Sequence, residues 1–374
     1  MDPTESGEVR MGMGTMRRTV VWGAALGLVA AVLAPAAATA TGTRAEAGGA
    51  GAGAPATVLF GDSYEQGFST GEDGRWMVIG DEDWPAGDGV PTTEGGTLRV
   101  APAAVHPGTG EPAFGRTTGQ QAEGGGGALD HIKWIAFPQV FTADGTPGFE
   151  VPATGSISCE HRLSARTYGT QDHPFGAAVS DPDSDPRLAS VGMVTADFAT
   201  QAIADFSVTN SAIYAIYERL PAEGATYAAY AYAIPVATRA PGDVHDLEIR
   251  IDQGGKRVTW LVDGRQKLQT DRIGTRAFDR RHMTIDHGGT EERLALRQVT
   301  CGFALGTLLD GARPGARQGQ GLVRLDSTPG FYFDPRSGQP VPQTFLDEAS
   351  GADSRLWGQG AELRVEWTRV VRRG

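Results

Sequence analysis

Residues 244–270 read VHDLEIRIDQGGKRVTWLVDGRQKLQT, and this stretch decides the fold class. Leu247, Ile249 and Ile251 alternate with charged residues, a period of two that places one side of a strand in a core and the other in water. The Gly-Gly pair at 254–255 and the Asp263-Gly264 pair supply the positive φ angles that tight reversals need. The stretch therefore predicts two successive β-hairpins and an antiparallel β protein.

Short strand-like runs continue along the rest of the chain. About a dozen of them, separated by turns roughly every 8–12 residues, predict a β-sandwich. The longest run, residues 156–168, reads SISCEHRLSARTY and alternates throughout. Residues 41–57 are rich in Gly and Ala and predict a disordered linker. No further linker follows, so we expect a single domain over residues 58–374.

The N-terminus has the layout of a secretory signal peptide over residues 1–40. Arg17 and Arg18 precede a mostly apolar run at 19–33, and Ala38-Thr39-Ala40 provides the small-x-small pattern of a cleavage site. A transmembrane anchor is the alternative, but the apolar run is short for one. The sequence therefore predicts an extracellular protein without stable membrane insertion after cleavage.

The charge balance excludes one class of partner. The 374 residues carry a net charge of −12, which repels phosphate backbones and anionic lipid surfaces. We therefore expect no nucleic-acid partner.

The two cysteines, Cys159 and Cys301, each lie in a strand-like run. In an exported protein an even pair of cysteines favours a disulfide, although two buried free thiols are the alternative. We predict the Cys159–Cys301 disulfide.

Three segments resemble the concanavalin A-like lectin/glucanase superfamily, which includes laminin G-like modules and laminarinase-type hydrolases. They read GFSTGEDGRW (67–76), HDLEIRIDQGGKRVTWLVDGR (245–265) and AELRVEWTRV (361–370). The whole chain also resembles a family of secreted actinobacterial proteins. The superfamily resemblance implies a jelly-roll sandwich of two antiparallel sheets with a concave ligand face, often for carbohydrate, and in some members a structural Ca²⁺.

One feature of the laminarinase-type hydrolases is missing. Their active sites use a compact E-x-D-x-(x)-E strand, and this chain contains no such run. The nearest counterpart in position is TADFATQAIADFSV (195–208), with Asp197 and Asp205.

A pair of carboxylates follows from the expected pairing of two adjacent strands. If residues 204–208 and 212–218 form a hairpin closed at Asn210-Ser211, one face is apolar and the other carries Asp205 and Glu218 as diagonal neighbours. Their backbones would then lie about 7–8 Å apart. Glycoside hydrolysis needs two carboxyl groups at such a separation, one as acid and one as nucleophile or base. The alternative is a pair of solvated surface residues.

Two groups of residues suggest ligand contacts. Tyrosines crowd two adjacent strands, and their rings could stack on sugars or pack in the core. The second face of residues 156–168 is too polar for a core and would face water or a ligand groove. The candidate ligand contacts are Tyr214, Tyr230, Tyr232, Arg162, Arg166 and Tyr168, and Glu160 is a third candidate catalytic carboxylate.

A loop carries three carboxylates at alternate positions, Asp181, Asp183 and Asp185. Calcium takes carboxylate oxygens from such loops, but the spacing is not that of an EF-hand, and a solvated acidic turn is the alternative. We expect no required cofactor and keep a structural Ca²⁺ as a hypothesis.

These patterns leave three functional hypotheses. The first is a secreted glycan-binding or glycan-processing protein, with binding slightly favoured. The second is a glycosidase or polysaccharide lyase that uses the carboxylate pair. The third is a β-sandwich pocket for a hydrophobic small molecule beside the Tyr- and Ala-rich residues 226–234.

Overall fold

The computed structural model describes residues 56–80, 87–117, 130–349 and 351–374. The expected signal peptide, and all of the expected linker except residues 56 and 57, lie outside these ranges. Within them, no helix is long and apolar enough to cross a membrane.

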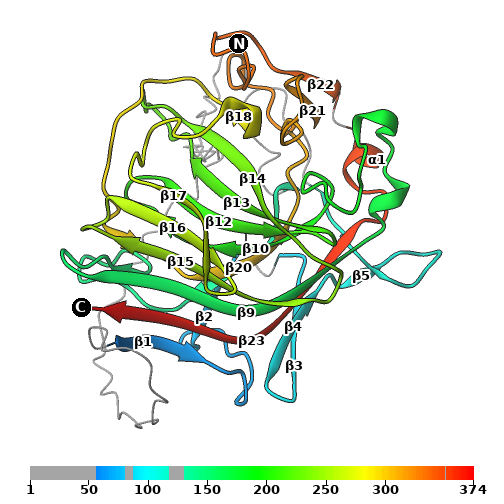
Figure 1. The fold of residues 1–374 in the computed structure, drawn as a ribbon. Coiled ribbons are helices and arrows are strands. Elements are labelled where there is room, and N and C mark those ends of the chain that lie inside the picture. Colours follow the sequence, from blue (N-terminus) through cyan, green and yellow to red (C-terminus); the bar gives the residue numbers. More distant parts are fainter. Residues whose placement is uncertain (1–55, 81–86, 118–129, 350) are drawn as a thin grey trace, which may run out of the picture.

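Two large antiparallel sheets face each other (Figure 1), which confirms the predicted all-β jelly-roll sandwich. The first has eight strands in the order β17 (Arg265–Thr270), β16 (Arg257–Val262), β15 (Val244–Asp252), β9 (Ser156–Tyr168), β23 (Gly360–Arg373), β4 (Thr97–Ala101) and β3 (Val90–Glu94), and β1 (Ala56–Asp62) also pairs with β23.

The second sheet has nine strands. Their order is β18 (Met283–Asp286), β14 (Tyr230–Thr238), β13 (Ala212–Arg219), β12 (Ala202–Val208), β10 (Ser190–Val194), β20 (Gly302–Gly306), β7 (Ile132–Pro138) and β2 (Trp76–Ile79), and β11 (Ala196–Asp197) also pairs with β12. Together the two sheets have seventeen strands, more than the expected dozen.

The remaining elements are short. Three two-stranded pairs are β5 (Ala104–Val105) with β6 (Pro112–Ala113), β8 (Phe149–Glu150) with β19 (Gln298–Val299), and β21 (Gln320–Val323) with β22 (Thr344–Asp347). The helical segments are α1 (Ala352–Arg355) and the 3₁₀ turns Thr170–Asp172, Gly176–Ala178 and Arg280–His282.

The two expected hairpins form at β15–β16–β17. Asp263 and Gly264 have φ angles of 51° and 70°, the positive values that a tight two-residue turn requires. Leu247, Ile249 and Ile251 are buried, as their period-two spacing predicted. The hairpins thus supply one edge of the eight-stranded sheet.

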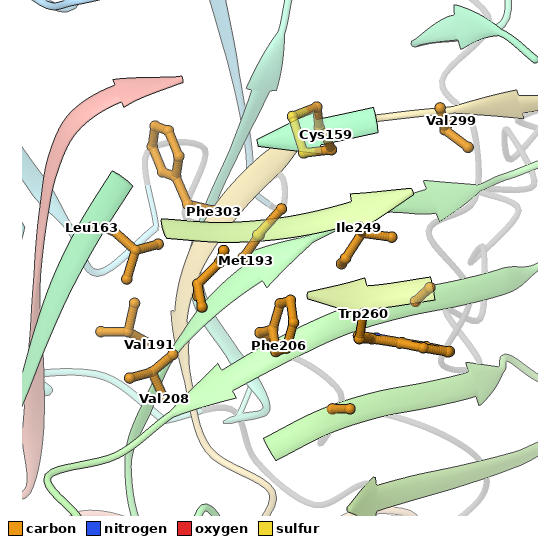
Figure 2. Close-up of a cluster of buried hydrophobic side chains, with 14 of the residues drawn as sticks. Cys159, Leu163, Val191, Met193, Phe206, Val208, Ile249, Trp260, Val299 and Phe303 are labelled. Atoms are coloured by element: carbon orange, nitrogen blue, oxygen red, sulfur yellow. A yellow bond between two sulfur atoms is a disulfide. The ribbon is translucent and has the colours of Figure 1, made fainter. Parts of the chain in front are cut away.

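The core lies between the sheets and draws side chains from both (Figure 2). Leu163, Ile249 and Trp260 come from the eight-stranded sheet, and Phe206 and Phe303 from the nine-stranded sheet. The disulfide between Cys159 and Cys301 joins β9 to the residue before β20, so it links the two layers and confirms the predicted pairing. Each sheet is left with one face turned away from this core, and we call these the outer faces.

Candidate acid–base site

The strand pair β12–β13 carries the carboxylate pair. The observed register places Ile203 opposite Glu218 and Asp205 opposite Ile216, which is the register expected from the sequence. Because side chains alternate, the intervening residues Ala204, Phe206, Val208, Ile213, Ala215 and Tyr217 all face the core. Asp205 and Glu218 therefore share the outer face as diagonal neighbours, about 7–8 Å apart at the backbone.

Two hydrogen bonds, one from the link between β10 and β11 and one from β16, hold Asp205 in place. Its Oδ1 accepts a hydrogen bond of 2.6 Å from the backbone N–H of Thr195, in the irregular link between β10 and β11. Its backbone carbonyl accepts one of 2.9 Å from the indole of Trp260 on β16. The hairpin that organises the fold is thus tied directly to the strand that carries the site.

A segment crosses the outer face above the pair. The backbone N–H of Thr307, just after β20, donates to His131, and that of Ala312 donates to Thr284 on β18. Since β10, β12, β13 and β14 separate β20 from β18, residues 307–312 pass over these strands. The segment carries Asp310 to the middle of the sheet.

Asp310 links two side chains at this crossing. One carboxylate oxygen lies 2.9 Å from Nε2 of His131, and the other accepts a hydrogen bond of 2.8 Å from the hydroxyl of Tyr332. Tyr332 belongs to the same buried cluster as Ala231 of β14, the strand position opposite Glu218. His131 and Asp310 therefore lie on the Glu218 side of the pair.

Burial and neighbouring charges shift the pKa values of Glu218, Asp205 and His131. Burial raises the pKa of Glu218 to about 7; the positive charge of His131 lowers it in part, and Asp310 raises it. Burial and then the charge of Glu218 hold the pKa of Asp205 well above its usual value. Burial lowers the pKa of His131, but the charge and hydrogen bond of Asp310 outweigh it and raise that pKa to about 9.

These shifts define what the site can do. Asp205 and Glu218 are only partly exposed and repel each other when both are ionised, so each carboxyl holds its proton to a higher pH than a solvated carboxyl does. One protonated carboxyl beside one carboxylate is the arrangement that transfers a proton to and from a reacting oxygen. The charged His131 above them favours the ionised member of the pair.

The structure does not bring Glu160 to this pair. Glu160 lies on β9 of the eight-stranded sheet, where its side chain accepts a hydrogen bond of 2.7 Å from Arg373 on β23. That outer face is on the opposite side of the sandwich from Asp205. The expectation that Glu160 is a third catalytic carboxylate is therefore corrected: it belongs to a surface ion pair.

Two of the three candidate ligand-binding tyrosines lie in the core. Tyr230 and Tyr232 are 1% and 0% exposed, and their hydroxyls donate to Tyr217 and to the carbonyl of Phe278. This corrects the expectation that they contact a ligand. Tyr214 does lie on the outer face, but its hydroxyl donates a hydrogen bond to the carbonyl of Ser184. Ser184 belongs to the loop that carries Asp181, Asp183 and Asp185, which we call the aspartate loop.

The polar face of β9 is divided between two environments. Arg162 forms ion pairs with Asp246 and Glu366 on the exposed surface, so it is not placed for a ligand groove. Arg166 lies over the ring of Tyr168, 5.2 Å from its centroid, and these two residues line a cavity at the end of the strand. Only the second pair retains the expected access to a ligand.

The three loop aspartates do not converge on one point. The Asp185 carboxylate pairs with Arg187 at 2.6 Å, and Asp183 accepts a hydrogen bond from Asn210, while Asp181 is exposed. This corrects the calcium hypothesis, because Asp185 has no oxygen directed to a shared ion. Among the described residues, the group of potential ligands that does converge is Cys159, His161 and Cys301, whose sulfurs are joined in the disulfide.

Sequence reasoning missed His131 and Asp310. His131 directly precedes β7, and Asp310 sits in a loop-rich region without a recognisable pattern. They lie 179 residues apart along the chain, and no local spacing connects them with Asp205 and Glu218.

A family match covers most of the chain. The profile of a family of unknown function, DUF6081, matches residues 61–374. The chain belongs to this family. A member of DUF6081 thus carries the fold described above, while the actinobacterial source and the export expected from the sequence stay predictions.

Several known proteins are similar to this chain. "Uncharacterized protein L829" of Acanthamoeba polyphaga mimivirus is 29% identical over 52% of this chain, and the match spans 65% of that protein's length. The endo-beta-1,3-glucanase from Pyrococcus furiosus is 12% identical, with a TM-score of 0.40 over 85% of this chain and 95% of the glucanase. A sialidase is also 12% identical, with a TM-score of 0.36 over 84% of this chain and 18% of its own. Similarity at this level says nothing of what the chain binds.

Proposed function

We propose that this protein is a glycan-processing enzyme in which Asp205 and Glu218 act as an acid–base pair. The observation that carries the proposal is their diagonal placement on the outer face of the nine-stranded sheet, with the pKa of Glu218 raised to about 7. Cleavage of a glycosidic bond requires one carboxyl that donates a proton and a second that acts as nucleophile or base. The resemblance of the sequence to jelly-roll lectins and glucanases supports a glycan as the substrate class.

Each residue has a role that its surroundings support. Glu218 gives up its proton near pH 7, so it suits the proton donor to a leaving oxygen. Asp205, anchored by the N–H of Thr195, faces it as the partner carboxyl. His131 and Asp310 are positioning residues, since they act on Glu218 through charge rather than on the substrate.

Processing is favoured over binding alone by the positions of the tyrosines. The binding hypothesis relies in part on tyrosine rings that stack on a sugar, but Tyr230 and Tyr232 both lie in the core. The acid–base pair, in contrast, keeps a partly exposed position on the outer face.

The test is product release from a panel of neutral, acidic and amino-sugar polysaccharides. Reducing-end and unsaturated-end assays run in parallel, because hydrolysis yields the first kind of end and lyase elimination the second. Glu218→Gln and Asp205→Asn should each lower the rate by about 10²–10⁴-fold. The matched control is Glu366→Gln, an exposed glutamate of the other sheet that pairs with Arg162.

The outcomes separate the functional classes. The proposal is supported if the wild type and the control release product and both site variants do not. Retention of the protein on a polymer without any product would replace it with a binding module. If the protein neither releases product nor is retained on a polymer, both glycan functions are excluded.

A further inference from the structure

A buried histidine lies against the disulfide that joins the two sheets. His161 follows Cys159 by two residues on β9, so both side chains point into the core, and Cys301 meets them from the residue before β20 (Figure 2). Nε2 of His161 lies 3.4 Å from the sulfur of Cys159 and 3.5 Å from the sulfur of Cys301. The three residues are at most 2% exposed. Three side chains that commonly ligate metals therefore converge inside the sandwich.

The distances between these atoms are those of ligands around one zinc ion. With zinc–sulfur bonds of about 2.3 Å and zinc–nitrogen bonds of about 2.0–2.1 Å, a tetrahedral site separates sulfur from nitrogen by about 3.6 Å. Both observed nitrogen–sulfur distances are close to this value. In a zinc site the two sulfurs would lie about 3.8 Å apart. Because the Cα atoms of Cys159 and Cys301 are 5.3 Å apart, rotation about their Cα–Cβ bonds gives that separation once the disulfide is reduced.

The other nitrogen of His161 is held as it is in a metal-ligating histidine. Nδ1 lies 2.8 Å from the hydroxyl oxygen of Thr368 on β23, and that oxygen lies 2.6 Å from the hydroxyl of Tyr64. When Nδ1 donates its proton to Thr368, Thr368 can donate to Tyr64, and Nε2 keeps the lone pair that a metal requires. This lone pair then faces the two sulfurs. The hydrogen bonds thus orient His161 for a ligand at the position between the sulfurs.

The charge of the three ligands favours a divalent ion. Deprotonated Cys159 and Cys301 carry two negative charges, and a neutral His161 adds none. A Zn²⁺ ion balances these charges, whereas a monovalent soft ion such as Cu⁺ would leave a net negative charge in the core. The backbone carbonyl of Arg369, 3.9 Å from the sulfur of Cys301, offers an oxygen for the fourth position of a tetrahedron.

We propose that Cys159, His161 and Cys301 bind one Zn²⁺ while the two cysteines are thiols, and that formation of the disulfide releases it. Zinc displaces the two thiol protons when it binds. On oxidation the two thiolates lose two electrons and form the S–S bond, Zn²⁺ leaves, and an external disulfide accepts the electrons and becomes two thiolates. Because the site is buried, zinc enters as the reduced chain folds. The site is independent of the acid–base pair.

The test is metal binding by the 374-residue chain, refolded after reduction with a phosphine in the presence of Zn²⁺ or Co²⁺. The reduced wild type should bind one ion per chain and show thiolate-to-cobalt charge-transfer absorption, whereas the disulfide form should show none. His161→Gln and Cys301→Ser each remove one ligand, and competition with a chromogenic chelator should show zinc affinity at least about tenfold weaker. Thr368→Val removes the partner of Nδ1 and should weaken affinity about 10–100-fold.

Two matched variants control for changes outside the site. His245→Gln removes a partly exposed histidine that pairs with Asp263, and Thr259→Val removes another buried strand hydroxyl of the same sheet. Both should keep the zinc affinity of the reduced wild type. Near-ultraviolet circular dichroism checks that each reduced protein is folded.

The results either support or overturn the zinc site. The proposal is supported if the reduced wild type and both controls bind zinc tightly, the three site variants bind it more weakly, and the disulfide form does not bind it. The proposal is overturned if the folded, reduced wild type binds no metal or if His161→Gln binds as tightly as the wild type. Equal affinity in concentrated urea also overturns it, because the thiols would then bind zinc without the fold. A reduced chain that stays unfolded in the presence of zinc has the same consequence.

Discussion

Nε2 of His131 lies 2.9 Å from a carboxylate oxygen of Asp310, above the strand that carries Glu218. The pair joins the start of β7 to a segment that crosses the outer face of the nine-stranded sheet. His131 therefore keeps a positive charge beside a carboxyl group whose ionisation it favours.

The first prediction concerns the pH dependence of this ion pair. The folded-state pKa of His131 is about 9, above the value of about 6.5 expected for the unfolded chain. Its stabilisation is therefore complete below about pH 6.5 and is lost as the pH rises through about 9. Over that range the free energy of unfolding of the wild type should fall by about 1–3 kcal/mol more than that of His131→Gln.

Urea unfolding at a series of pH values measures this difference. Asp310→Asn should remove the same pH dependence, because it removes the charge that raises the pKa of His131. If the free energy of unfolding changes with pH in parallel for the wild type and both variants, the raised pKa assigned to His131 is contradicted.

The second prediction is that Glu218→Gln stabilises the fold while it removes activity. The folded-state pKa of Glu218 is raised to about 7, so the stability associated with its protonated form is lost as the pH rises through about 7. Glutamine stays neutral, and the variant should exceed the wild type by about 1–3 kcal/mol above that pH. Thermal unfolding near pH 8 and near pH 5 measures the change.

The exposed Glu366→Gln variant is the control and should show no such gain. A Glu218→Gln protein that is less stable than the wild type near pH 8 would indicate a solvated, structural glutamate.

The third prediction concerns the link between the two sheets. The disulfide closes a loop with a sequence separation of 142 residues. Constraining so long a loop in the unfolded chain stabilises the fold by about 4–5 kcal/mol in the chain-entropy model. The Cys159→Ser, Cys301→Ser double variant should lose that amount in urea unfolding. A wild type that unfolds at the same urea concentration with and without dithiothreitol would argue against the bond.

The fourth prediction concerns the aspartate loop. The Asp185–Arg187 ion pair is buried, with side chains 4% and 2% exposed, so Asp185→Asn leaves a buried guanidinium without its countercharge. The loss should be about 3–5 kcal/mol in the free energy of unfolding. Calcium chloride and EDTA should leave the melting temperature of the wild type unchanged. A rise of several degrees with calcium would restore the metal hypothesis.

Local sequence patterns were sufficient to predict the hairpin strands and which of them pair. Period-two alternation and the Asp263-Gly264 turn determined the two hairpins, and the short turn after Val208 determined the register that makes Asp205 and Glu218 diagonal. These features depend on residues close in sequence, whose geometry is limited by the backbone itself.

Alternation did not determine which face of a strand turns inward. Tyr230 and Tyr232 share one face of β14 and Ala231 the other, and both assignments fit the sequence until the second sheet covers one of them. The position of Glu160, on the opposite side of the sandwich from Asp205, was undetermined for the same reason.

The surroundings of the acid–base pair were decided by tertiary structure alone. His131 and Asp310 reach Glu218 because residues 307–312 cross four strands of a sheet. The sequence by itself determined the class of fold and the hairpin registers, since these follow from spacing along one or two strands. It favoured the disulfide because the chain has only two cysteines. Which charges share a site depends on contacts between segments far apart in the chain, and no periodicity records them.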